Sequence, residues 1–318
     1  MDIYVNNGVY SFGFDKLDRW IDLLLKYKVK VIEMSHLFTQ WGAKHAPKVI
    51  ATVDGETKKI FGWETDALSD EYGDFLVTFL RALLAYLKEK GVDQMCCYHI
   101  SDEPHLDHLE NYIAAKKKVQ EVLKDYPIID ALSDIDFYKT GAVEHPVPGN
   151  NAIEAFIEEK VEHLWTYYCC SQAVDVSNRF VAMPSARNRI IGAQFYKYDI
   201  EGFLHWGFNF YFNRFSDSLV NPYQDASGDY FVPAGDAFSV YPKADGTALD
   251  TIHFLVFKHA IEDLRAMELC ESLYDKDFVM NLIEGDLSEK ITFSKYPKEA
   301  QYLLTLREKI NAAIKAKL

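Results

Sequence analysis

The stretch "QMCCYHISDEP" (Gln94–Pro104) joins a short apolar run to a pair of acids and then to a proline. A bounded apolar run of this length is typical of a buried strand. Pro104 suits the first turn of a helix, because its missing N–H has no intrahelical partner there. The stretch therefore predicts a strand, a turn and a helix in succession, with Asp102 and Glu103 at the carboxyl end of the strand.

Short β-rich runs alternate with longer amphipathic helices along the chain, which is the pattern of an α/β fold with a parallel sheet. The predicted strands cover residues 29–38, 94–100, 128–133, 164–170 and 203–211, with a weaker one near 3–12. Apolar residues at helical spacing predict a helix over 76–87 that stops at Gly91. Further helices are predicted after Pro104, from Pro184, over 252–267 and after Lys295.

Unusual polar and aromatic residues fall at the carboxyl ends of these strands: His36, Gln40 and Trp41, then His99, Asp102 and Glu103, then Tyr167, then Trp206 and Asn209. In a (β/α)8 barrel the active site is built on this face. We therefore expect a (β/α)8 TIM-type barrel, formed as a single domain by residues 1–318 with a C-terminal helical extension over 274–318. About six strands are found where a complete barrel needs eight, so the barrel is expected to lack N-terminal strand(s).

The composition limits the classes of partner. The chain has 318 residues, 49% of them hydrophobic, and a formal net charge of -14. This charge repels nucleic acid and anionic membrane surfaces, so neither is an expected partner, and a neutral substrate fits it better. No apolar run has the roughly 18 residues needed to span a bilayer, and residues 1–16 lack the apolar core of a signal peptide. The chain as it stands is therefore expected to be cytoplasmic, without membrane insertion.

Glycoside hydrolysis usually needs two carboxyl groups, one as acid and one as base or nucleophile. In the substrate-assisted variant the sugar's own 2-acetamido oxygen is the nucleophile. Asp102 and Glu103 would face opposite ways on a regular strand, but at a strand end both can lean over one pocket. Like charges this close push the two pKa values apart, which leaves one acid and one carboxylate. The competing interpretation is that the two acids cap the next helix, and the motif alone leaves both open.

Aromatic residues near the strand ends favour a sugar site. Trp41, Trp165, Tyr167, Trp206 and Tyr211 offer flat apolar faces of the kind on which sugar rings pack. Core packing is the better explanation for any single tryptophan, but five such aromatic residues near strand ends favour a binding site. The predicted substrate-binding residues are His36, Gln40, Trp41, His99, Trp165, Tyr167, Trp206, Asn209 and Tyr211.

Histidines beside the acids raise the alternative of a metal site. His99 and Asp102 precede His105 and His108, and these four could converge on an ion. No H-E-x-x-H spacing is present, and the five cysteines, with no C-x-x-C spacing, are expected to be small buried side chains. No metal and no cofactor is expected, and a metal-dependent hydrolase is the least favoured alternative.

Six motifs taken together resemble the catalytic domain of glycoside hydrolase family 123, formerly a domain of unknown function. They are "SHLFTQWGA" (35–43), "YHISDEP" (98–104), "LWTYYCC" (164–170), "MPSARNRIIGAQFY" (183–196), "GFLHWGFNFY" (202–211) and "AGDAFSVYP" (234–242). The resemblance extends from about Gly8 to Leu273. It implies a (β/α)8 barrel and a retaining, exo-acting β-N-acetylhexosaminidase, with β-N-acetylgalactosaminides as the preferred substrates. The implied partner is a carbohydrate with a terminal 2-acetamido sugar.

The resemblance also implies the roles of individual residues. Asp102 would orient the 2-acetamido group and stabilise the oxazolinium intermediate, and Glu103 would protonate the leaving oxygen and then act as base on water. Trp165, Tyr167 and Trp206 would line the sugar subsite. The family's domain normally has further barrel sequence upstream, so the chain is expected to be N-terminally truncated relative to it. A carbohydrate-binding barrel without catalysis is therefore kept as the alternative.

Overall fold

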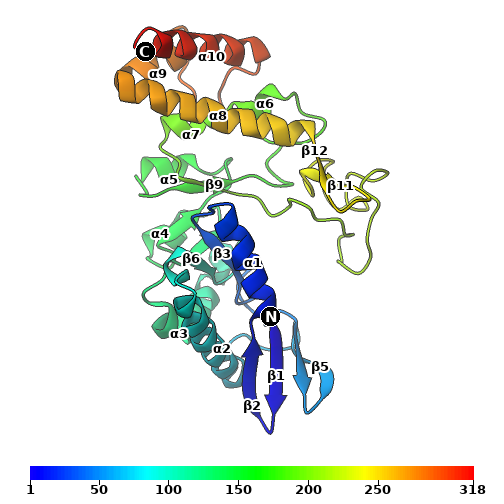
Figure 1. Ribbon diagram of the computed structural model, residues 1–318. Helices are drawn as coiled ribbons and strands as arrows, with labels where there is room; N and C mark the ends of the chain where they lie inside the picture. Colours follow the sequence, from blue (N-terminus) through cyan, green and yellow to red (C-terminus); the bar gives the residue numbers. More distant parts are fainter. The chain divides into compact units, whose positions relative to one another are not determined.

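The computed structural model describes residues 1–318 of the protein. The chain forms two compact units, Met1–Val147 and Pro148–Leu318, and Figure 1 labels their helices and strands. Each unit has its own strands, helices and buried residues. The single domain predicted over 1–318, with its extension over 274–318, stays a prediction.

A four-stranded sheet in the order β2-β1-β4-β5 begins the first unit, with β1 Asp2–Asn6, β2 Val9–Gly13, β4 Val49–Val53 and β5 Glu56–Phe61. Two antiparallel hairpins form it, and β1 pairs with β4 in parallel. The hairpins turn at Asn7-Gly8 (φ 50° and 77°) and at Asp54-Gly55 (φ 48° and 89°). Asn-Gly and Asp-Gly favour this tight turn because both positions need a positive φ. The prediction of one weak strand near 3–12 overlooked these two signals.

Parallel strands form the rest of the first unit: β3 Ile32–His36, β6 Cys96–His99, β7 Ile129–Ala131 and β8 His145–Val147. β3 pairs with β6, and β7 pairs with β8. A parallel bridge between Tyr98 and Ile128 brings β6 next to the start of β7. The carboxyl ends of β3, β6 and β7 are therefore neighbours, and the predicted strands 29–38, 94–100 and 128–133 are confirmed in shortened form.

The helices of this unit are α1 Asp15–Lys26, α2 Asp70–Glu89, α3 Leu109–Leu123 and α4 Asp136–Lys139, with 3-10 turns η1 Asp93–Met95 and η2 Leu106–His108. Helix α2 begins at Ser69, whose hydroxyl accepts a hydrogen bond from Tyr72 N. It ends just before Gly91, which has a φ of 68°. The predicted helix and its stop are thus confirmed, and α3 confirms the helix expected after Pro104. Helix α1 was not predicted.

In the second unit β9 Trp165–Tyr167 pairs in parallel with β10 Gly202–Leu204, and β11 Val240–Pro242 pairs antiparallel with β12 Ala248–Asp250. The helices are α5 Glu154–Glu158, α6 Ala186–Arg189, α7 Ile191–Lys197, α8 Ile252–Leu273, α9 Lys276–Glu284 and α10 Ala300–Lys315. Helices α8, α9 and α10 share a core that includes Met267, Ile283 and Leu306, and they lie together in Figure 1. No helix of either unit combines the length and apolar character needed to cross a lipid bilayer.

The predicted (β/α)8 barrel is wrong. The strands form one four-stranded and four two-stranded sheets, and no closed barrel is present. A barrel closes only when every strand is paired on both sides, and here the N-terminal strands pair as hairpins instead. The strand predicted over 203–211 ends at Leu204. Beyond it isolated main-chain hydrogen bonds, such as Phe210 N to Ala237 O at 3.1 Å, replace a ladder.

Cys96, Cys97 and Cys270 are free thiols. All three are buried, as predicted. The prediction is wrong for Cys170, which is exposed, and for Cys169, which is partly exposed, because both follow β9 where the chain leaves the strand.

Candidate active site

The acidic pair lies directly after β6, where the chain passes from the strand toward η2. Main-chain hydrogen bonds hold this segment from both sides. Trp41 N donates to Asp102 O at 2.8 Å, and Glu103 N donates to Ala131 O at 2.9 Å. The loop after β3 and the last residue of β7 therefore fix the backbone of both acids.

Ser101 ties the same segment to the loop after β3. Its side chain is 0% exposed, and its hydroxyl donates to Thr39 O at 2.8 Å. The same oxygen accepts hydrogen bonds from Gly42 N at 3.3 Å and Ala43 N at 3.1 Å. Gly42 has a φ of 110°, and a Cβ placed there would lie 2.4 Å from Cγ of His108. Only glycine fits this loop, and the sequence reasoning assigned no role to either Ser101 or Gly42.

Three non-glycine residues in and near the acidic pair have a left-handed backbone conformation. Glu103 has a φ of 42°, Trp41 of 60° and Ala43 of 54°. Non-glycine residues rarely adopt such values, and a residue before proline is disfavoured there as well. Each costs about 1–3 kcal/mol and persists only where the surroundings enforce it, most often at functional sites. The hydrogen bonds around Ser101 and Ala131 supply that constraint.

The surroundings of Asp102 change its ionisation. Burial raises the pKa of Asp102 to about 6; the negative charges of Glu103 and Asp130 act in the same direction, whereas His99 opposes them. Asp102 is therefore protonated below about pH 6 and ionised above it. A pKa of about 6 lies near the operating pH of most enzymes, where a carboxylate is useful for catalysis.

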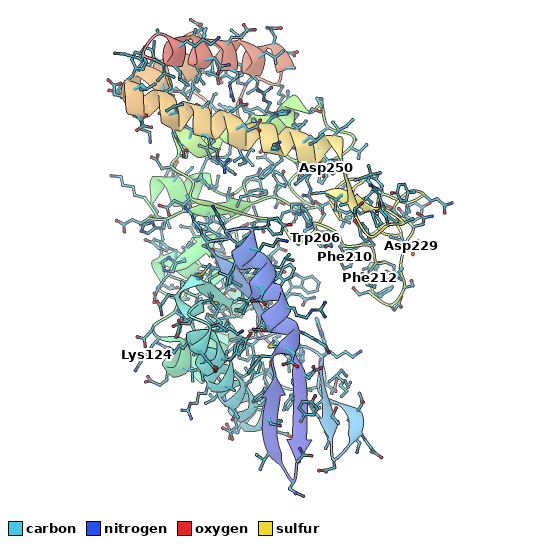
Figure 2. All side chains as sticks on the ribbon, viewed as in Figure 1. Lys124, Trp206, Phe210, Phe212, Asp229 and Asp250 are labelled. Atoms are coloured by element: carbon cyan, nitrogen blue, oxygen red, sulfur yellow. The ribbon has the colours of Figure 1, made fainter.

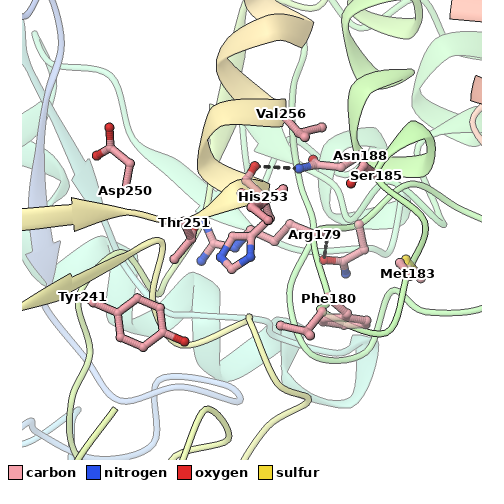
Figure 3. A pocket seen from close by; sticks show the side chains of 13 residues that line it. Arg179, Phe180, Met183, Ser185, Asn188, Tyr241, Asp250, Thr251, His253 and Val256 are labelled. Atoms are coloured by element: carbon pink, nitrogen blue, oxygen red, sulfur yellow. Dashed lines mark hydrogen bonds between the residues drawn. The ribbon is translucent and has the colours of Figure 1, made fainter. Parts of the chain in front are cut away.

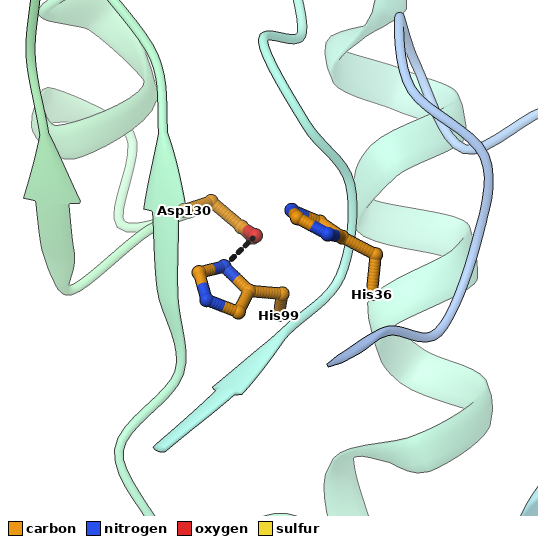
Figure 4. A group of neighbouring side chains, drawn as sticks. All are labelled: His36, His99 and Asp130. Atoms are coloured by element: carbon orange, nitrogen blue, oxygen red, sulfur yellow. Dashed lines mark hydrogen bonds and ion pairs between the residues drawn. The ribbon is translucent and has the colours of Figure 1, made fainter. Parts of the chain in front are cut away.

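An ion-paired group with a buried histidine at its centre lies beside the acidic pair, formed by residues of β3, β6 and β7. His99 is 1% exposed, with Nε2 2.8 Å from Oε1 of Glu33 and Nδ1 3.3 Å from Oδ1 of Asp130; Figure 4 shows the contact with Asp130. Burial lowers the pKa of His99, but the hydrogen bonds to Asp130 and Glu33 outweigh it and raise the pKa to about 9. His99 is therefore an imidazolium at neutral pH, which favours a positioning role over direct contact with a sugar.

Asp130 is 0% exposed and accepts from three other residues. Ile100 N donates to its two oxygens at 3.0 and 3.2 Å, Tyr112 Oη donates at 2.5 Å, and His99 is the third donor. Burial raises the pKa of Asp130, and these donors oppose that shift. Sequence reasoning missed Glu33 and Asp130, although each is the only acid in its predicted strand.

His36, His99 and Asp130 place possible metal-binding atoms within 4.8 Å of one another. Figure 4 shows the His36 ring beside that of His99, and their centroids are 4.5 Å apart. Both nitrogens of His99 already face carboxylates, and Asp130 already accepts from three donors. This donor set fits an ion-paired network and does not fit a metal shell. His105 and His108 lie outside the group, and His108 Nδ1 accepts from His105 N at 3.2 Å.

The other site residues predicted in the first unit lie close in the chain to this network. His36 ends β3, and burial, followed by the charge of His99, lowers its pKa to about 4, so its ring is neutral. Gln40 and Trp41 follow in the loop, and the Trp41 side chain is 55% exposed. The first unit thus brings together His36, His99, Asp102 and Glu103, with the Trp41 backbone bound to Asp102.

In the second unit the indole of Trp206 is held by its edge. Its Nε1 donates to Oδ2 of Asp236 at 2.8 Å, while His205 Nε2 lies 3.1 Å from Oδ1 of the same carboxylate. Asp236 is 0% exposed, whereas Trp206 is 42% exposed. The tryptophan therefore combines an anchored edge with an accessible surface, as a sugar-stacking residue requires.

Two hydrogen-bond donors on the other side of the ring fix the orientation of His205. Its Nδ1 lies 3.0 Å from Gly207 N and 3.0 Å from Arg179 Nη2, both of which are donors. His205 must therefore accept at Nδ1 and carry its proton on Nε2, facing Asp236. Burial lowers the pKa of His205, which agrees with a neutral ring. Arg179 and Asp236 were not predicted, although Asp236 lies in the motif "AGDAFSVYP".

The remaining predicted residues occupy different places in this unit. Trp165 begins β9 and lies opposite Gly202 of β10, where a Cβ would come within 2.1 Å of the indole ring. Tyr167 is at the other end of β9. Asn209 forms a β-bridge with Phe238, and Tyr211 Oη donates to Val240 O at 2.6 Å. Asn209, Tyr211 and Trp206 therefore contact one segment, 236–240, and Trp165 does not share these contacts.

Aromatic residues continue along the loop that leaves β10. Trp206 meets Phe210 at a ring distance of 5.2 Å, and Phe210 meets Phe212 at 5.7 Å; Figure 2 labels all three. Phe210 and Tyr211 of this loop also pack against the core cluster around Phe238.

A separate cavity of about 490 Å³ lies at the start of α8. Figure 3 shows its lining, which includes Phe180, Met183, Tyr241 and His253. None of the predicted substrate-binding residues lines it. Arg179 links it to the Trp206 network, since the same residue lines the cavity and lies 3.0 Å from His205.

Comparison with known proteins identifies the family. Residues 3–270 match the family described as glycoside hydrolase 123, catalytic domain, and no curated protein sequence matches the chain. The structure of a family 123 glycoside hydrolase from Clostridium perfringens, solved in a study of glycolipid glycan hydrolysis, shares the fold with a TM-score of 0.69 at 17% identity. The likeness covers 99% of this chain and 57% of that one, so the chain spans little more than half the length of that protein. By its sequence match, the chain belongs to the glycoside hydrolase 123 catalytic domain family.

Proposed function

We propose that the chain is a retaining exo-β-N-acetylhexosaminidase that acts on terminal 2-acetamido sugars, with β-N-acetylgalactosaminides as preferred substrates. The observation that carries the proposal is the acidic pair Asp102 and Glu103 at the end of a buried strand, fixed by hydrogen bonds on both sides. Family membership supports glycoside hydrolysis as the reaction class.

Asp102 acts on the acetamido group of the substrate. Above pH about 6 its carboxylate is ionised and can accept a hydrogen bond from the acetamido N–H. This orients the acetamido oxygen toward C1, where it displaces the leaving group and forms an oxazolinium intermediate. The negative charge then stabilises the positive charge that develops on that ring.

Glu103 acts on the glycosidic oxygen. It donates its proton to the leaving group as the C1–O bond breaks, and becomes a carboxylate. It then takes a proton from the water that opens the oxazolinium at C1, so the second displacement restores the starting configuration and the starting protonation state.

In the second unit, Trp206 is the proposed sugar-stacking residue. Trp206 is suited to this task because Asp236 holds its edge and leaves its surface partly exposed. Trp41 offers a second exposed indole beside the acids. His36, Gln40, Trp165, Tyr167, Asn209 and Tyr211 remain proposed substrate-binding residues.

The test is hydrolysis of aryl 2-acetamido-β-galactosides and glucosides by the wild type, Glu103→Gln and Asp102→Asn. We expect both variants to lose at least about 100-fold in kcat, and a thiazoline analogue of the oxazolinium to inhibit the wild type. The matched control is Asp107→Asn, an exposed acid in η2, which should retain wild-type activity. Full activity in both active-site variants refutes the proposal, and sugar binding by calorimetry without any turnover supports the non-catalytic alternative.

A further inference from the structure

The ion-paired group of Glu33, His99 and Asp130 holds a positive charge on the His99 ring, beside the acidic pair. An imidazole that faces an acceptor with each nitrogen can donate from both only when it is protonated. Glu33 is on β3 and Asp130 is on β7. The His99 imidazolium on β6 therefore binds a carboxylate from each of these two strands. Burying such a charge costs several kcal/mol unless it is paired. Each nitrogen of the His99 ring is paired with a carboxylate.

Asp130 also holds the backbone that leads to Asp102. Both of its oxygens accept from Ile100 N, and Tyr112 on α3 donates to Oδ2. Ile100 lies between His99 and Ser101, whose side chain binds the loop after β3. One buried carboxylate thus fixes the His99 ring and the main chain two residues before Asp102.

We propose that Glu33, His99 and Asp130 act together as positioning residues for the acidic pair, in which the His99 imidazolium supplies the positive charge that keeps the Asp102 carboxylate ionised. The inference rests on the proposed role of Asp102 as an ionised carboxylate. It assigns functions to Glu33 and Asp130, and it gives His99 a positioning role without contact with the substrate.

The charges around Asp102 show why this cation matters. Glu103, Asp130 and Glu33 all raise its pKa, as burial does, and His99 lowers it. His36 cannot take over this task, because burial and the charge of His99 lower its pKa to about 4 and leave it neutral. Tyr112 faces Asp130 with a pKa raised by burial, so it is also neutral. Loss of the His99 charge should therefore leave Asp102 protonated at a higher pH.

The decisive variant is His99→Gln, which keeps a polar side chain and removes the charge. The positive charge of His99 lowers the pKa of Asp102. We therefore expect the titration of Asp102, followed by carbon-13 NMR and assigned with Asp102→Asn, to move to higher pH when this charge is removed. The acid limb of the kcat profile should move by the same amount, with activity recovered at higher pH. A merely structural role would lower activity at every pH without moving the limb.

Glu33→Gln is the second variant, since the partly exposed Glu33 side chain tolerates substitution without loss of folding. It should lower the pKa of His99, read by nitrogen-15 NMR, below the wild-type value of about 9. His163→Gln is the matched control: His163 is exposed and pairs with Glu201 at 2.8 Å, so it should move neither titration. A neutral His99 at pH 7 in the wild type, or an unchanged Asp102 titration in His99→Gln, overturns the proposal. Both titrations need no turnover, so they remain decisive even if no glycoside is hydrolysed.

Discussion

Replacement of Gly42 by alanine tests how the loop after β3 is held against the acidic pair. Gly42 has a φ of 110°, and the added Cβ would lie 2.4 Å from Cγ of His108 and 2.8 Å from its Cδ2. The backbone conformation alone costs an alanine about 1–3 kcal/mol. The steric overlap adds about 1–3 kcal/mol, as overpacking does elsewhere. The expected loss of unfolding free energy in Gly42→Ala is therefore about 2–6 kcal/mol.

Gly55→Ala separates these two contributions. Gly55 has a φ of 89°, and nothing lies within 4 Å of the Cβ that alanine would add. Urea unfolding should show a loss of only about 1–3 kcal/mol for this variant, and the double variant Gly42→Ala/His108→Ala should recover part of the loss at position 42. Because the Trp41 backbone binds Asp102, Gly42→Ala should also lower kcat whereas Gly55→Ala should not. Equal destabilisation by both glycine substitutions would refute the described loop geometry.

Three further outcomes are expected. Asp236→Asn removes the charged acceptor of Trp206 and His205. Because a hydrogen bond to a charged group contributes about 1.5–3 kcal/mol, this variant should raise KM about tenfold with a smaller effect on kcat. An unchanged KM contradicts the anchoring role of Asp236. Burial raises the folded pKa of Asp102 from 3.8 to about 6, so its ionisation destabilises the folded state as pH rises through this range. Asp102→Asn should thus be more stable than the wild type by about 2–3 kcal/mol at pH 8 and equal to it below pH 4, and urea unfolding that shows no gain at pH 8 contradicts the shift. Gly202→Ala should displace Trp165, whose ring atoms lie 2.1 Å from the added Cβ, and lower the melting temperature; a wild-type melting temperature argues against that packing.

Local features could be read from the sequence because they depend on neighbouring residues. The apolar run before Asp102 became β6, and the leucine spacing before Gly91 became α2. The position of the acidic pair at a strand end followed from that apolar run and from Pro104 after it. The hairpin turns were equally local, at Asn7-Gly8 and Asp54-Gly55, and were overlooked.

Pairing over long distances could not be read in this way. Glu33 and Asp130 are each the only acid in their strand, and nothing near them in the chain shows that both bind His99. Asp236 likewise reaches Trp206 across 30 residues of irregular chain. The barrel was inferred from alternating elements alone, which do not establish that the strands close into one sheet.

In the proposed reaction, Asp102 and Glu103 hydrolyse glycosides with help from the substrate's acetamido group. This is tested by comparing an aryl 2-acetamido-β-galactoside with the aryl β-galactoside that lacks the acetamido group, using the wild type and Asp102→Asn. We expect the wild type to hydrolyse only the first substrate and Asp102→Asn to lose this activity. Equal hydrolysis of both substrates, or full activity in Asp102→Asn, would contradict the proposed reaction.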